Sequence, residues 1–220
     1  MEKIIHGVIF DMDGVLFDSE PVYDECTFNI MQRRGVSLTH HDLKDLRGLT
    51  SEFFWQRLVE RHKLQVSAEE LLKEETVALE HAFAFSSAVM PTPGIKELLL
   101  ELGSRNIPIA VGTSSQRPRA EIILKRFGFY DLFKKVVTSA EVTQGKPHPD
   151  IFLLASNGLN INPKNCLVIE DSTNGMMAAK KAGMFAVGLL GPSNQDQSME
   201  YADFVITHPI ELWNAPCLFK

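Results

Sequence analysis

The sequence is poor in cysteine. Its 220 residues include three cysteines, Cys26, Cys166 and Cys217, and no two of them form a C-x-x-C pair. An odd number of widely spaced cysteines supports neither a disulfide framework nor a zinc site. A chain of this length buries roughly 70% of its unfolded surface and needs no covalent staple to fold. We therefore expect a protein of the reducing cytoplasm.

Long hydrophobic runs are also missing. No stretch approaches the ~20 apolar residues that span a bilayer, and the apolar run near the N-terminus is short and followed at once by carboxylates. A secretory signal needs a longer apolar region. The sequence therefore predicts no membrane segment and no membrane partner.

Positive charge is in deficit. Lysine and arginine number 22 against 28 aspartates and glutamates, which gives a formal net charge of −6 and a pI of about 5.7. Phosphate backbones are bound by clustered lysine and arginine, so this balance argues against a nucleic-acid partner. An anionic substrate would need a few local cations or a metal ion.

Short apolar runs that alternate with helical segments are what the sequence does contain. Six runs rich in β-branched residues lack two-residue alternation, which is typical of strands buried on both faces; they are residues 4–10, 107–112, 136–137, 166–169, 185–190 and 204–206. Four helical segments lie between them, and each closes on a glycine, the residue preferred just beyond a helix; they are residues 94–103, 119–128, 150–158 and 174–183. This alternation predicts an α/β fold, a doubly wound parallel-sheet (Rossmann-like) core.

One long segment breaks the alternation. Between residues 17 and 85 the periodicity is helical, and Ser67-x-x-Glu70 forms a capping box at the start of its last helix. The sequence MPTPG at residues 90–94 then marks a stiff connector. We therefore expect a core domain over residues 1–16 and 90–220, with an inserted α-helical domain over residues 17–89.

Polar side chains follow several of the predicted strands. Asp11 and Asp13 follow the first strand, and Thr113 and Ser114 follow the second. A loop containing Lys146 comes after the third. Glu170 and Asp171 follow the fourth. Ligands of doubly wound sheets bind beyond the carboxyl ends of the strands, so we expect these groups to share one cleft.

The chemistry of this set favours a phosphate ester and a divalent cation. Four carboxylates in one cleft repel one another and either raise a pKa or recruit a cation, and a set of oxygen ligands suits Mg²⁺. Thr113, the backbone N–H groups of Ser114 and Ser115, and Lys146 are suited to hold phosphate oxygens. An aspartate can attack phosphorus, and a second one can protonate the leaving oxygen and then activate water.

Four ordered motifs carry a family resemblance. They are Asp11-x-Asp13-Gly14, Val111-Gly112-Thr113-Ser114, Gly145-Lys146-Pro147 and Glu170-Asp171-Ser172-x-x-Gly175. Together they resemble the motifs of the haloacid dehalogenase-like hydrolase superfamily, and most closely its β-phosphoglucomutase-like branch, which has a helical cap inserted after the first motif.

The resemblance implies a role for each of these residues. Asp11 would be the nucleophile and Asp13 the general acid/base. Mg²⁺ would be held by Asp11, the Asp13 backbone carbonyl and Asp171, with Glu170 nearby. Thr113, Ser114 and Lys146 would bind the transferred phosphoryl group, and residues 17–89 would form the cap.

Two departures from the mutase pattern favour a phosphatase. In the sugar-phosphate mutases of this branch a histidine lies four residues after a hinge Ser/Thr, whereas here Ser19 is followed by Tyr23. The mutases also carry an arginine after a Gly-x-Ser/Thr, whereas Gly48-Leu49-Thr50 is followed by Ser51. We expect a monomeric Mg²⁺-dependent phosphatase acting on a small phosphomonoester, a sugar phosphate or nucleoside monophosphate.

Three other functions stay open. A sugar phosphomutase is the first alternative. A serine hydrolase would use Ser114 on a strand-to-helix turn, but Gln116 stands where a nucleophile elbow has its second glycine. A phosphate-binding module without catalysis is the third, although none of the motifs is broken.

Overall fold

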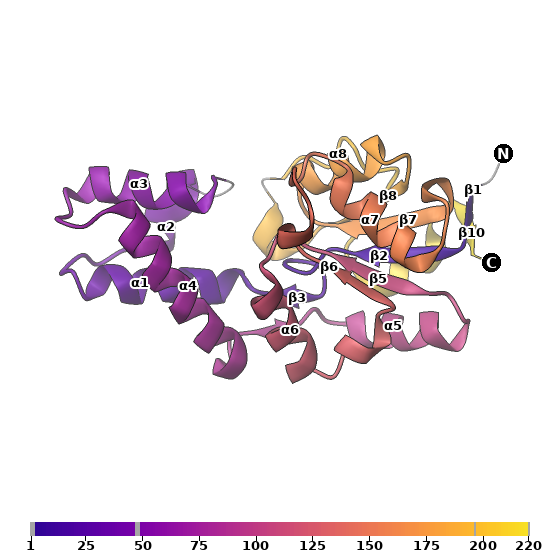
Figure 1. Ribbon diagram of the computed structural model, residues 1–220, viewed down its shortest axis with the longest axis horizontal. Coiled ribbons are helices and arrows are strands. Elements are labelled where there is room, and N and C mark those ends of the chain that lie inside the picture. The colour runs from indigo at the N-terminus through magenta and orange to yellow at the C-terminus, as the bar shows by residue number, and fades with distance from the viewer. Residues whose placement is uncertain (1–2, 47–48, 196, 220) are drawn as a thin grey trace. The chain divides into compact units, whose positions relative to one another are not determined.

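The computed structural model describes residues 3–46, 49–195 and 197–219 (Figure 1). The chain divides into two compact units, one made of Met1–Asp18 and Met90–Lys220, the other of Ser19–Val89. Arg47 and Gly48, the latter part of one departure from the mutase pattern, lie outside the described residues.

A six-stranded parallel sheet forms the centre of the first unit. Its order is β6-β5-β2-β7-β8-β9, and every neighbouring pair is parallel. The strands are β2 (Gly7–Phe10), β5 (Ile109–Gly112), β6 (Lys135–Val137), β7 (Cys166–Glu170), β8 (Phe185–Leu189) and β9 (Phe204–Ile206). The order reverses at β2, as in a doubly wound sheet. The predicted α/β fold class is therefore confirmed.

Helices cover both faces of this sheet. They are α5 (Ile95–Ser104), α6 (Arg117–Arg126), α7 (Asp150–Leu159) and α8 (Thr173–Lys181), and Figure 1 shows α7 and α8 on one face with α5 and α6 on the other. Phe152, Ala178 and Ala179 of α7 and α8 lie in one buried cluster with Ile9 and Val168 of the sheet. Because both faces are buried, the strands read as continuous apolar runs.

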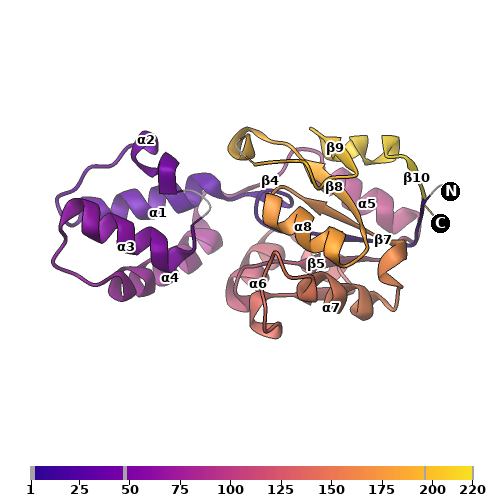
Figure 2. The same ribbon diagram turned by 90° about the horizontal axis from the view of Figure 1, so that it is seen from above.

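The first predicted strand, residues 4–10, is in fact two strands. β1 (Lys3–Ile5) pairs with β10 (Cys217–Phe219), whereas β2 pairs with β5 and β7. His6 separates them, and its N–H donates to the carbonyl of Asn165 instead of to a strand. Figure 1 shows β1 and β10 side by side, and Figure 2 shows β10 beside the marks for both ends of the chain. The prediction of one strand was wrong because the apolar pattern does not reveal a change of pairing partner.

Two of the four helix ends differ from the glycine rule. Gly128 and Gly183 have the expected positive φ beyond α6 and α8. However, α5 continues past Gly103 to Ser104, and α7 continues past Gly158 to Leu159. There the left-handed residues are Asn106 (φ 57°) and Asn160 (φ 58°), because a short polar side chain also tolerates this conformation.

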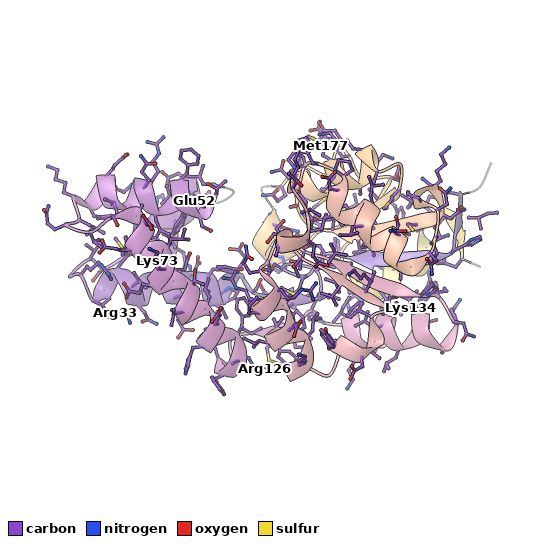
Figure 3. The ribbon with its side chains drawn as sticks, viewed as in Figure 1. Arg33, Glu52, Lys73, Arg126, Lys134 and Met177 are labelled. Carbon is purple, nitrogen blue, oxygen red and sulfur yellow. The ribbon has the colours of Figure 1, made fainter. Side chains whose placement is uncertain are left out.

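The second unit is helical. Its helices are α1 (Glu20–Gln32), α2 (His40–Leu43), α3 (Ser51–His62) and α4 (Ala68–Phe85). Trp55 and Leu58 of α3 are buried with Ile30 of α1 and Leu71 of α4. The predicted capping box at Ser67 and Glu70 is present. Figure 3 shows Arg33, Glu52 and Lys73 on the outside of this unit.

Short elements complete the described chain. They are β3 (Phe17–Asp18), β4 (Met90–Pro91), and the 3₁₀ helices η1 (Lys44–Leu46), η2 (Tyr130–Leu132), η3 (Ser139–Glu141), η4 (Pro163–Asn165), η5 (Pro192–Asn194) and η6 (Pro209–Asn214). β3 and β4 pair antiparallel, so the chain leaves the first unit beside the point where it re-enters. Across the described ranges, no helix combines the length and the apolar character that crossing a bilayer requires.

Candidate active site

The predicted site residues lie at one edge of the sheet. β5, β2 and β7 are adjacent and parallel, so the residues that follow them are neighbours. Asp11 and Asp13 follow β2, Thr113 and Ser114 follow β5, Glu170 ends β7 with Asp171 next to it, and Lys146 comes from the loop before α7. This edge lies at the reversal of strand order, where doubly wound folds bind ligands.

Lys146 joins two of the predicted carboxylates. Its Nζ donates to Asp11 Oδ1 and, at 2.6 Å, to Glu170 Oε1. The side chains are almost fully buried, at 6% exposure for Lys146, 8% for Asp11 and 1% for Glu170. The Nζ also lies 4.9 Å from the centre of the Phe152 ring. A long side chain from a distant loop is thereby fixed against the end of β2.

Burial dominates the electrostatics of this edge. It raises the pKa of Asp11 to about 7, and the positive charge of Lys146 only partly offsets this effect. Burial also raises the pKa of Asp171 well above its ordinary value, and the charges of Glu170 and Asp11 add to the increase. Burial alone would lower the pKa of Lys146, but Asp11 and Glu170 raise it above its usual value. Burial and the neighbouring carboxylates therefore both favour the protonated forms of Asp11 and Asp171, and Lys146 opposes them.

Glu170 is held from two sides. Its Oε2 accepts hydrogen bonds from the backbone N–H of Ser172 at 2.7 Å and from its hydroxyl at 2.9 Å, while Oε1 faces Lys146. A Cβ on Gly175, in the first turn of α8, would overlap the carboxylate. Only glycine lets α8 approach β7 this closely.

The carboxylate of Asp171 lies against Gly14 of the first motif. A Cβ on Gly14 would overlap the Asp171 carboxylate, and Gly14 has φ +79°, a conformation suited to glycine. The carbonyl of Asp171 accepts a hydrogen bond of 3.1 Å from Nδ2 of Asn194. A cavity of about 310 Å³ is lined by Asp171, Gly14 and residues beyond β8 and β9. Asp171 thus borders open space.

The residues beyond β5 differ in exposure. Thr113 is buried, and its Oγ1 accepts a hydrogen bond of 3.0 Å from the N–H of Ser115. Ser114 is exposed. The hydroxyl of Ser115 is buried and donates to Oδ2 of Asp13 at 2.7 Å. The turn therefore exposes Ser114 and directs the Ser115 hydroxyl toward the first motif.

The donor set is compatible with Mg²⁺. Across residues 3–46, 49–195 and 197–219, no three histidine, cysteine, aspartate or glutamate side chains converge as metal ligands. Mg²⁺ needs less, because it binds through one or two carboxylates and keeps several waters. Asp11 and Asp171 supply two carboxylates with raised pKa values, and Asp171 borders the cavity. A cation here would relieve the repulsion between them.

The two departures from the mutase pattern lie in the helical unit. The Tyr23 ring packs edge-on against Phe83 at 5.8 Å. Ser51 begins α3, after Thr50 as its N-cap. Both line a cavity of about 210 Å³ within this unit.

Three supporting side chains were not predicted as members of the site. The Ser115 hydroxyl, the Ser172 side chain and Asn194 each contact a predicted site residue. Ser172 belongs to the fourth motif, so its position was a signal. Asn194 lies in the segment beyond β8, and nothing in its sequence surroundings distinguishes it.

Comparison with known proteins identifies the class to which this fold and these strand-end residues belong. The family model of haloacid dehalogenase-like hydrolases matches residues 8–189. The chain belongs to this family, as the four motifs predicted.

Individual relatives refine the comparison. The chain is 32% identical over 212 residues to a phosphorylated carbohydrates phosphatase of Thermotoga maritima, covering 96% of this chain and 97% of the relative. It is 31% identical over 211 residues to the β-phosphoglucomutase of Bacillus subtilis, covering 94% and 91%. The crystal structure of CbbY from Rhodobacter sphaeroides in complex with phosphate aligns with a TM-score of 0.81 at 25% identity, covering 95% and 96%. Phosphatases and a mutase are thus both among the relatives.

Proposed function

We propose that this protein is a phosphatase that hydrolyses a small phosphorylated metabolite through an aspartyl-phosphate. The observation that carries the proposal is the buried contact of Lys146 with Asp11 at the carboxyl end of β2. An ammonium group beside a strand-end carboxylate can draw phosphate oxygens to the atom that attacks phosphorus.

Each step of the proposed reaction is carried out by named residues of this chain. Lys146, Thr113 and Ser114 bind the phosphoryl group, and Asp11 attacks phosphorus in line. Asp13 protonates the leaving oxygen as its bond to phosphorus breaks. Asp13 then takes a proton from a water molecule whose oxygen attacks the phosphorus. The bond between Asp11 and phosphorus breaks, which releases phosphate and restores the Asp11 carboxylate.

Mg²⁺ is part of the proposal. It would be held by the carboxylates of Asp11 and Asp171 and by the backbone carbonyl of Asp13, with Glu170 as a further ligand. When bound, it neutralises phosphate charge that Lys146 alone cannot balance. This fits the raised pKa values of Asp11 and Asp171, which reflect burial first and the charges of neighbouring carboxylates second.

The helical unit favours a phosphatase over a mutase. Its cavity is lined by Tyr23 and Ser51, which stand at the histidine and arginine positions of the mutases. Glu20, Asp24 and Glu75 also line the cavity, and its described lining holds no lysine or arginine. Asp24 also contacts His40, whose Nδ1 lies 2.6 Å from Asp24 Oδ2. The described lining thus has no lysine or arginine of the kind that would attract a second phosphate. We propose residues 17–89 as the cap and a sugar phosphate or nucleoside monophosphate as substrate, turned over by a monomer in the cytoplasm.

The test is phosphate release together with trapping. With Mg²⁺, p-nitrophenyl phosphate should be hydrolysed, and a panel of sugar phosphates and nucleoside monophosphates should identify the substrate. Asp11→Asn should reduce turnover by about 10³-fold or more, because the nucleophile is lost. EDTA should abolish activity.

Three results would contradict the proposal. A BeF₃⁻ adduct should form on Asp11, and an adduct on Ser114 would indicate a serine hydrolase. Isomerised sugar phosphate without released phosphate would indicate the mutase. Phosphate binding without any turnover across the panel would indicate a binding module.

A further inference from the structure

Ser115 is buried, and the four motifs assign no role to its side chain. It is 7% exposed, while the neighbouring Ser114 is exposed. Its hydroxyl donates to Oδ2 of Asp13 at 2.7 Å across the gap between the ends of β5 and β2. A short hydrogen bond to a carboxylate is of the stronger, charge-assisted kind.

The Ser115 backbone is fixed by contacts on both sides. Its N–H donates to Thr113 Oγ1 at 3.0 Å. Its carbonyl accepts from the N–H and the hydroxyl of Ser139, beyond β6, each at 3.4 Å. The hydroxyl is thus presented to Asp13 from a turn anchored to the residues beyond two strands.

Asp13 needs such a partner because of its place in the chain. It lies in the turn between β2 and β3, three residues beyond the end of β2, where an aspartate can adopt several rotamers. Proton transfer to a leaving oxygen demands one of them, and orientation contributes much of the rate in such steps. A fixed donor on one carboxyl oxygen limits the orientations that the carboxyl group can adopt.

We propose that Ser115 is a positioning residue that orients the carboxyl group of Asp13 for protonation of the leaving oxygen. This inference rests on the proposed function. In the affected step the Asp11–phosphorus bond forms, the bond between phosphorus and the leaving oxygen breaks, and the Asp13 proton moves to that oxygen. A leaving group that departs as a stable anion needs no proton.

The experiment compares two esters that differ in this requirement. The values of kcat/KM for phenyl phosphate and p-nitrophenyl phosphate are measured for the wild type, Ser115→Ala and Ser115→Thr. Ser115→Ala should lose about tenfold or more with phenyl phosphate, and less than about threefold with p-nitrophenyl phosphate, because p-nitrophenolate leaves without a proton. Ser115→Thr, which keeps the hydroxyl, should recover most of the loss.

A buried serine outside the site supplies the control. Ser156 of α7 is 1% exposed, and its hydroxyl donates to the carbonyl of Leu153. Ser156→Ala should change neither ester, and a melting curve of each variant should confirm folding. An equal loss of both esters in Ser115→Ala, or no loss, would overturn the inference while phosphatase activity stands. If the wild type hydrolyses neither ester, the proposed function fails and this inference fails with it.

Discussion

Lys146 is a single side chain that contributes to the stability of the fold because it is buried among opposite charges. Its ammonium group is shared between Asp11 and Glu170, and all three side chains are almost fully buried. Removing one partner of a buried ion pair leaves an uncompensated charge, which costs about 3–5 kcal/mol. Under the proposed function, binding of the phosphoryl group and stability of the fold therefore depend on the same residue.

This arrangement gives a prediction for Lys146→Met. The variant should lose most of its phosphatase activity, and its metal-free form should lose about 3–5 kcal/mol of unfolding free energy. Urea unfolding in EDTA and steady-state kinetics with Mg²⁺ measure the two effects. Lys134→Met is the matched control, since Lys134 is exposed on the first unit (Figure 3). Equal stability of the two variants would contradict the buried ion pair.

At this scale the sequence predicted the residues that meet but not their orientations. Asp11 and Lys146 could be placed together because each follows a strand of one parallel sheet. The hydrogen bond from Ser115 to Asp13 could not, because it depends on which side chain of the Thr113–Ser115 turn faces inward. The left-handed Asn106 and Asn160 were missed for a similar reason, since the choice between asparagine and glycine is made locally.

Among the elements, the close approach of α8 to β7 has a functional consequence. Glu170 ends β7, and Gly175 lies in the first turn of α8 directly against its carboxylate. The N–H of Gly175 also donates to the Ser172 hydroxyl, which in turn donates to Glu170. The start of the helix and the end of the strand form one support for Lys146.

We therefore predict that Gly175→Ala disrupts the site, because the added methyl group would overlap the carboxylate of Glu170. Displacing Glu170 should lower activity by about tenfold or more and destabilise the protein by about 1–3 kcal/mol, as overpacking does. The control is Gly103→Ala in α5, where a Cβ meets nothing within 4 Å; it should be neutral or stabilising by up to about 1 kcal/mol. Kinetics and urea unfolding of both variants check this, and wild-type activity in Gly175→Ala would refute it.

The elements themselves were largely predictable, with instructive exceptions. Strands buried on both faces are marked by continuous apolar runs, so the six-stranded sheet and its helices were identified. The split between β1 and β2 was missed because both halves are apolar and only their partners differ. β3 and β4 have two residues each and were missed because a pair so short has no periodicity.

For the molecule as a whole, the buried carboxylates couple stability to pH. The pKa of Asp11 is about 7 in the folded protein against an ordinary value of 3.8, and that of Asp171 is also raised. The metal-free folded state therefore binds more protons than the unfolded state between about pH 4 and pH 7. Its stability must fall as the pH rises through this window.

The corresponding prediction concerns melting temperatures from pH 5 to pH 8. In EDTA the wild type should melt at a lower temperature at pH 7.5 than at pH 5.5, and in Asp11→Asn this decrease should be smaller. At the proposed Mg²⁺ site the ion would compete with protons for the carboxylates, so the increase in melting temperature that Mg²⁺ causes should grow with pH. A Mg²⁺ effect that is the same at every pH would contradict a metal site on these groups.

The short pair of β3 and β4 has an evolutionary consequence. Asp18 and Met90 are direct partners in this pair, so the whole segment between them begins and ends at one place on the sheet-containing unit. A segment attached in this way can be shortened, extended or replaced with little change in the entropy of loop closure. The inserted helices of this chain can therefore be altered or replaced while the ends of the sheet strands keep their positions.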